Sequence, residues 1–389
     1  MEDDVPGASV DGRPGKIEAY VKPDYALDVS QVYLDFTKLV LEHSQRLSLL
    51  SWVEDPADRE LVGAPSWVPD YSVWHASWSI PHRGLRKKLE PLSCLPATQP
   101  GKNKTGSRFS DRSHVVESSV LVCYGAAFDT VREVCGQTVD VMLDGERFED
   151  MLESCCHLPE TRNGQHRVEV LWRTLIADAM KPRHGSLIIH PAPDIISYTF
   201  RALVALNAFK AISDDQLNEE VPVESAGGDL EGFEPTITDM LKEGARMSLS
   251  EFDHLLRRID PNSTSNALPS IGEIAQYVEK QRARTTVGEI LTVRDLFEIA
   301  QTFVASSYTA FSRKLYITQG GTMGLGPKST SPGDRVYFLH GALTPFILRE
   351  KGGGDCSLIG ETYLHGFMHG ETLGDEYGWK NKVGDVRIV

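Results

Sequence analysis

The stretch RKLYITQGGTMGLGPKSTSPGDRVYFLHGALTPFILR (residues 313–349) decides how the C-terminal part of this chain folds. Its apolar runs are short, contain many β-branched and aromatic residues, and are separated by glycine, proline and aspartate, which is typical of strands joined by turns. The run CSLIGETYL (residues 356–364) continues the pattern. Short strands at this spacing predict a small antiparallel, barrel-like β unit over residues 312–389.

Upstream of this unit the sequence predicts mostly helices. Apolar residues recur at helical spacing in residues 29–50, 168–180, 196–211, 235–259, 271–284 and 292–311. In the first of these helices, which Asp28 can cap, one apolar stripe contains Val29, Val32, Tyr33, Phe36, Leu39 and Val40. The segment SHVVESSVLVCYGAAFDTVREV (residues 113–134) differs, because its β-branched runs around Gly125 predict two paired strands.

The fold class expected from these patterns is α+β, with a helical block combined with antiparallel β structure. We divide the chain into a disordered lead-in at residues 1–21, a mixed body at residues 22–311 that includes a Trp/Pro-rich loop, and the β-rich unit at residues 312–389 packed on that body.

The composition restricts the possible partners. A chain of 389 residues with 41% hydrophobic residues can bury a core without a metal or a disulfide. The net charge of −15 argues against nucleic acid and against an anionic membrane surface, because both attract basic faces. The six cysteines form no CxxC pair, the N-terminus lacks the apolar run of a signal peptide, and no run approaches the length of a membrane span. We therefore expect free thiols and a cytoplasmic protein of undetermined oligomeric state.

The Trp/Pro-rich loop begins with PSWVPDYS (residues 65–72) and continues to Trp78. In a structural interpretation, Trp67 and Tyr71 bury their rings and Asp70 caps nearby amides. In a functional interpretation, Asp70 is a polar group of a pocket for an apolar or aromatic ligand. The walls of that pocket would be Trp67, Tyr71, Trp74 and Trp78.

A second candidate site lies in YLHGFMHGE (residues 363–371). His365 and His369 are four residues apart, which on a helix would place both imidazoles on one face, but the glycine after each of them disfavours a helix. We therefore predict no metal site. His365, His369 and Glu371 are instead candidates for proton transfer, next to the substrate-binding candidate Tyr363. The alternative is that the histidines are structural residues with satisfied hydrogen bonds.

Five segments, in order, resemble the region that follows the heterokaryon-incompatibility (HET) domain in proteins of filamentous fungi. They are KPDYALDVSQVYLDFTKLVLE (22–42), LSLLSWVEDP with LVGAPSWVPDYS (47–56 and 61–72), VEVLWRTLIAD (168–178), the stretch at 313–349 and YLHGFMHGE (363–371). The resemblance implies the C-terminal body of such a protein and spans nearly the full chain. The N-terminal HET domain of the family, which resembles a signalling or NADase-like fold, would precede Lys22. We expect that domain to be missing, and none of its functional residues has a counterpart here.

Two functions of different classes fit this reading. The first is a cofactor-independent enzyme of fungal specialised metabolism that binds a small apolar polyketide or terpenoid intermediate and steers dehydration, cyclisation or a (hetero-)Diels–Alder-type cycloaddition. Such an enzyme would need no cofactor. The glycine-rich loop at residues 318–329 lacks the GK[ST] ending of a phosphate-binding loop, so we do not expect a nucleotide there. The alternative is a non-enzymatic recognition or regulatory module in heterokaryon incompatibility. We rank the enzyme first; it requires a deep apolar cavity, whereas the module requires a filled core and an exposed apolar patch.

Overall fold

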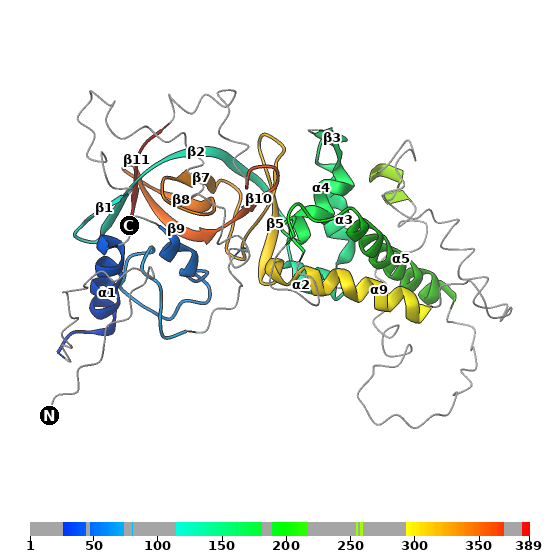
Figure 1. The fold of residues 1–389 in the computed structure, drawn as a ribbon, viewed down its shortest axis with the longest axis horizontal. Coiled ribbons are helices and arrows are strands. Elements are labelled where there is room, and N and C mark those ends of the chain that lie inside the picture. Colours follow the sequence, from blue (N-terminus) through cyan, green and yellow to red (C-terminus); the bar gives the residue numbers. More distant parts are fainter. Residues whose placement is uncertain are drawn as a thin grey trace, which may run out of the picture.

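The computed structural model describes residues 26–43, 47–73, 80, 114–145, 147–162, 164–180, 189–216, 254–255, 257–259, 293–368 and 383–389. These residues form the α+β fold that the sequence predicts. Most strands lie in one half of the molecule and most helices in the other (Figure 1). The expected lead-in at 1–21, the helix at 271–284 and most of the helix at 235–259 lie outside the described residues.

The main structural element is a nine-stranded sheet that combines strands from the middle and the end of the chain. The strands from the middle of the chain are β1 (His114–Glu117) and β2 (Val120–Val134). The later strands are β5 (Arg313–Thr318), β6 (Met323–Pro327), β7 (Arg335–Leu339), β8 (Phe346–Gly352), β9 (Asp355–Glu361), β10 (Tyr363–Leu364) and β11 (Gly384–Ile388). Their order is β10-β6-β5-β2-β11-β9-β8-β7, and β1 pairs with β2.

Five of these strands form a closed ring. β2 pairs with β11 through residues 121–125 and with β7 through residues 125–130. β11 pairs with β9, β9 with β8, and β8 with β7, so the path of hydrogen bonds returns to β2. The last residues of β2 pair with β5, which continues the sheet through β6 to β10. Among the described ladders only β11–β9 is parallel. The C-terminal strands thus share their sheet with β1 and β2, and the boundary at residue 312 stays a prediction.

Gly125 lies inside β2 rather than between the two strands predicted around it. The strands are present, but the turn that joins them is at Ser118 and Ser119, where Ser118 adopts a positive φ of 58°. A Cβ on Gly125 would lie 2.7 Å from both the Leu339 side chain and the Phe338 carbonyl oxygen of β7. Glycine is therefore needed here because it lets two paired strands of the ring approach closely.

The helical half confirms three of the predicted helices. They are α4 (Arg167–Leu175), α5 (Ile195–Gln216) and α9 (Val293–Ser306). Phe200 of α5 and Phe303 of α9 pack with their ring centroids 5.1 Å apart. The sequence reading missed two short helices, α2 (Val139–Leu143) and α3 (Phe148–Cys156), the small hairpin of β3 (Thr161–Arg162) and β4 (Gln165–His166), and the 3-10 turn η2 (Tyr308–Ala310).

Helix α4 ends at Leu175, five residues earlier than predicted. The chain turns back after this residue, and Arg173 stabilises the turn. Ala177 and Asp178 adopt positive φ values of 50° and 48°, which no helix can continue. The buried Arg173 guanidinium donates hydrogen bonds to the carboxylates of Asp178 and Asp194 and to the Ala192 carbonyl. Arg173 thus joins the two described ends of the connection between α4 and α5, together with the backbone bridge between Met180 and Ile189.

The first helix, α1 (Val29–His43), is also shorter than predicted, and a 3-10 turn, η1 (Ser48–Trp52), follows it. Its buried residues are Thr37 and Leu41. Tyr33 and Leu34 pack against a cluster that also contains Trp67 and alternate residues of β7, Tyr337 and Leu339. The side of α1 that enters the core therefore differs from the predicted apolar stripe, of which Tyr33 is the member that packs against this cluster. The intervening β7 residues Val336 and Phe338 belong to a separate cluster on the other face of the strand.

Candidate functional site

Trp67, the first wall of the predicted ligand pocket, is completely buried. Its side chain is 0% exposed and packs among Leu47, Leu50 and Leu358. Its indole N–H donates a hydrogen bond of 3.0 Å to the Ser119 carbonyl oxygen. Trp74 and Trp78 lie outside the described residues. The position of Trp67 agrees with the structural interpretation of this loop, in which a buried indole fills space and satisfies its one donor.

Asp70 acts as a cap for neighbouring backbone amides. Its carboxylate accepts hydrogen bonds from the N–H groups of Glu60 (2.9 Å), Leu61 (2.7 Å) and Ser72 (3.1 Å). Its own N–H donates to the buried Glu54 carboxylate at 2.7 Å. Burial alone would raise the pKa of Asp70, but the hydrogen bonds from Ser72, Leu61 and Glu60 together lower it below its ordinary value. The predicted capping role is therefore observed.

Replacing Asp70 by asparagine should reduce the loss of folding stability that occurs as the pH falls into the acidic range. A lowered pKa means that the ionised carboxylate stabilises the folded state above its ordinary pKa of about 3.9, and that this contribution disappears as the pH falls through the folded-state value. We expect Asp70→Asn to cost about 1 to 3 kcal/mol near neutral pH and much less near pH 3. Urea unfolding at both pH values measures this difference. The exposed Asp385 provides the control, because Asp385→Asn should change stability little at either pH.

Two of the C-terminal candidates, Tyr363 and His365, belong to a buried hydrogen-bond chain. His365 Nδ1 lies 3.1 Å from the Tyr363 hydroxyl, and His365 Nε2 lies 2.9 Å from Gln165 Oε1. A neutral imidazole protonated on Nε2 satisfies both contacts. Residues 365–368 form turns and bends, not a helix, while His369 and Glu371 lie outside the described residues. Across the described residues, no group of three or more His, Cys, Asp or Glu side chains could hold a metal ion.

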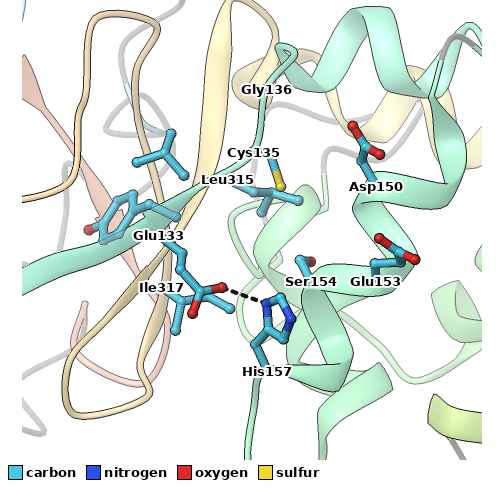
Figure 2. Close-up of a pocket in the computed structure, with 11 residues that line it drawn as sticks. Glu133, Cys135, Gly136, Asp150, Glu153, Ser154, His157, Leu315 and Ile317 are labelled. Atoms are coloured by element: carbon cyan, nitrogen blue, oxygen red, sulfur yellow. Dashed lines mark ion pairs between the residues drawn. The ribbon is translucent and has the colours of Figure 1, made fainter.

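A hollow opens between the end of β2, the middle of β5 and helix α3, as Figure 2 shows. Its volume is about 190 Å³. Its polar side chains include His157, which pairs with Glu133 at 2.5 Å, and Asp150, which pairs with Arg147. Burial raises the pKa of Cys135 to about 12, so this thiol stays protonated and is a poor nucleophile at neutral pH. Among the described residues of the two predicted sites, none lines this hollow.

The outer face of α1 is the feature that sequence reasoning missed. Val29, Val32 and Phe36 lie on one side of the helix and are 55%, 39% and 41% exposed. Leu27, which precedes the helix, is 41% exposed, and Tyr71 is 40% exposed. The Tyr71 ring packs edge-on against Phe36 and Tyr33, with centroid distances of 5.4 and 5.1 Å, and its hydroxyl lies 3.2 Å from the Thr37 hydroxyl. We name these five residues (Leu27, Val29, Val32, Phe36 and Tyr71) the α1 patch.

The α1 patch contains half of the large hydrophobic side chains that are exposed in the described part of the chain. The others are Trp52, Val62, Ile189, Ile195 and Tyr198. Single exposed apolar residues are normal on soluble proteins, whereas a group on one helix face is typical of an interaction site. The sequence did contain the signal, because Leu34 and Leu41 lie beside the predicted stripe, and the apolar residues of this helix together cover more than one buried face requires.

Comparisons with known proteins point to one family. Residues 273–377, which include α9 and the strands from β5 to β10, match the Het-6 beta-barrel domain. The chain is also similar to "Heterokaryon incompatibility protein 6, OR allele" of Neurospora crassa, with 39% identity over 62 residues. The matched stretch covers 15% of this chain and 9% of that relative, so the chain corresponds to a small part of the relative's length.

Two further findings complete the comparison. No solved structure matches the chain. Among the helices that the structure describes, none combines the length and the apolar character needed to cross a membrane. The matched domain and the Neurospora relative agree with the resemblance found in the sequence. The chain therefore carries a C-terminal region related to fungal heterokaryon-incompatibility proteins.

Proposed function

We propose that this chain is a non-enzymatic recognition or regulatory module in fungal heterokaryon incompatibility and that it acts by binding a partner protein. The relation to the Het-6 beta-barrel domain supports the biological setting. The observation that carries the molecular role is the α1 patch, an exposed apolar surface on a helix whose other side packs against a buried cluster. Such a patch is a property expected of the module rather than of the enzyme.

The enzyme hypothesis receives less support from the same residues. Trp67 and Asp70 are both 0% exposed and make internal contacts, and His365 and Tyr363 bond to each other inside the protein. A pocket for a polyketide or terpenoid would need several of these side chains to face a common space. A small apolar ligand and a cytoplasmic location both stay predictions.

The rigid placement of α1 suits protein recognition. Asp28 caps the helix, since its carboxylate accepts a hydrogen bond of 2.8 Å from the Gln31 N–H. At the other end, His114 Nε2 of β1 lies 2.8 Å from the Leu41 carbonyl oxygen. Because the helix is already ordered, a partner that binds it does not have to supply the free energy of ordering it.

Hyphal fusion tests examine this function directly. A strain that lacks the gene should give an altered fusion outcome, compatible instead of incompatible or the reverse, with at least one tester strain. The wild-type gene and the Ile195→Glu gene should restore the original outcome, because Ile195 is 69% exposed and lies on α5, away from α1. Val32→Glu should not restore it. An unchanged fusion outcome together with an altered metabolite profile would favour the enzyme instead.

A further inference from the structure

A seven-residue pattern on α1 indicates what kind of partner the α1 patch accepts. Val29 and Phe36 are seven residues apart, and so are Val32 and Leu39. The second pair begins three residues after the first. These are the a and d positions of two heptads, the spacing with which one helix packs along another. In a helix of 15 residues, three exposed apolar side chains and the half-buried Leu39 thus form a seam along the helix axis.

Acidic residues follow the same repeat along one side of the seam. Asp28, Asp35 and Glu42 are exposed and occupy successive g positions, next to the d residues Val32 and Leu39. Asp35 also contacts Gln31 and Lys38, at 2.8 and 3.9 Å, but these are exposed contacts that a partner can replace. In paired helices the residues at g face those at e or g of the neighbour and decide which neighbour is accepted.

The other side of the seam faces the protein itself. The e position Tyr33 packs against the Tyr71 ring and the core cluster that contains Trp67. A second helix on the seam would therefore have Tyr71 on one side and the acidic row on the other. In the described part of this surface, the acidic row is the flank whose charges can select the partner.

We propose that the α1 patch binds an amphipathic helix of a partner protein, and that this helix has large aliphatic residues along its seam and lysine or arginine beside them. This inference rests on the proposed function and specifies the partner for it. Opposite charges at the flanking positions favour such a helix over a neutral or acidic one.

A second copy of this chain is a poorer occupant. Each chain carries a net charge of −15, so two copies repel each other. An antiparallel pair of α1 helices would also set the two acidic rows face to face. In a parallel pair the acidic row of one copy would face the e positions of the other, Tyr33 and Val40. These are uncharged, and Tyr33 already packs against Tyr71.

The test uses two synthetic peptides of about three heptads, each with leucine or isoleucine at every a and d position. One peptide has lysine and the other glutamate at e and g. Fluorescence anisotropy measures the binding of each labelled peptide to the full chain and to three variants. The variants are Val32→Glu, Asp35→Lys with Glu42→Lys, and the control Ile195→Glu. Asp28 is left unchanged because it caps the helix.

We expect the lysine peptide to bind wild type and Ile195→Glu alike, and to bind Val32→Glu at least roughly tenfold more weakly. The Asp35→Lys, Glu42→Lys variant should bind the glutamate peptide better than the lysine peptide. That exchange of preference is a result that a loss of folding could not produce. Higher salt should weaken both matched pairs, since the selecting charges are exposed.

Three results would overturn the proposal: equal binding of the two peptides to wild type, no binding of either, or full binding by Val32→Glu. Analytical ultracentrifugation could give a fourth such result. If wild type is a dimer and Val32→Glu is a monomer, the occupant of the α1 patch is a second copy of this chain. The fusion tests separate this inference from the proposed function. If deletion alters fusion but Val32→Glu restores the outcome, the module acts through another surface and only the α1 assignment fails.

Discussion

Replacing Trp67 by alanine is expected to lower the free energy of unfolding by about 3 to 5 kcal/mol, the range for removing a buried tryptophan. The indole lies where η1, β1 and the ring of strands meet, in contact with the cluster that also contains Leu50 and Leu358. Alanine would leave a cavity among rigid neighbours and would also leave the Ser119 carbonyl oxygen without this donor. Urea unfolding followed by circular dichroism measures the loss.

Trp52 provides a matched control in the same part of the protein. Its side chain is 48% exposed, and so Trp52→Ala should cost a small fraction of the Trp67→Ala loss. The comparison also tests the roles that the sequence left open for the Trp/Pro-rich loop. If Trp67→Ala were as stable as wild type, the indole would be free to serve as a ligand wall, and the enzyme hypothesis would regain its main candidate.

Breaking the buried ion pair between Arg313 and Glu361 is expected to have a similarly large effect. Both side chains are nearly inaccessible, and Arg313 donates to the Glu361 carboxylate at 2.7 Å and to the Glu361 carbonyl oxygen at 2.9 Å. Burial lowers the pKa of Arg313, although the nearby Glu361 opposes this shift. Arg313→Met would leave a carboxylate buried without its cation, which costs about 3 to 5 kcal/mol.

A double-mutant cycle separates the pair from its burial cost. Arg313→Met combined with Glu361→Leu removes both charges, and we expect the double variant to be more stable than either single variant. Glu361 also accepts the Ile80 N–H at 2.7 Å, so part of the loss should remain. The exposed pair of Arg335 and Glu350 is the control, because Glu350→Gln should cost no more than about 1 kcal/mol. Additive losses from Arg313→Met and Glu361→Leu would contradict the proposed coupling.

The parts of the fold that could be predicted are those that local patterns determine. The strands between residues 313 and 349 and the helices α4, α5 and α9 all have apolar residues at the spacing of their own element. The closed ring could not be predicted, because it depends on the pairing of β2 with β7 and β11, which lie far away in the sequence. Helix α2 was missed because its five residues contain too few turns for a period to show. Helix α3 is as long as α4, and its apolar residues Phe148, Met151 and Cys155 recur at helical spacing, so its signal was present and was overlooked.

The candidate sites show the same limit. Aromatic and histidine side chains were identified in the sequence, but their partners were not. His365 bonds to Gln165, which is 200 residues earlier, and Trp67 bonds to Ser119. The apolar stripe of α1 was recognised, yet periodicity does not say which of its sides meets the core. Whether a side chain belongs to a pocket, a core or a surface therefore depends on tertiary contacts that local patterns do not contain.

The closed ring also constrains how a newly made chain can reach its native state. The ribosome synthesises β2 long before β11, and β2 cannot complete its ladders until β11 has emerged. Non-local pairings of this kind have a high contact order and form slowly. Until then the open edge of β2 can pair with strands of other nascent chains. Efficient production of this protein should therefore depend on chaperones that shield the early strands until translation is complete.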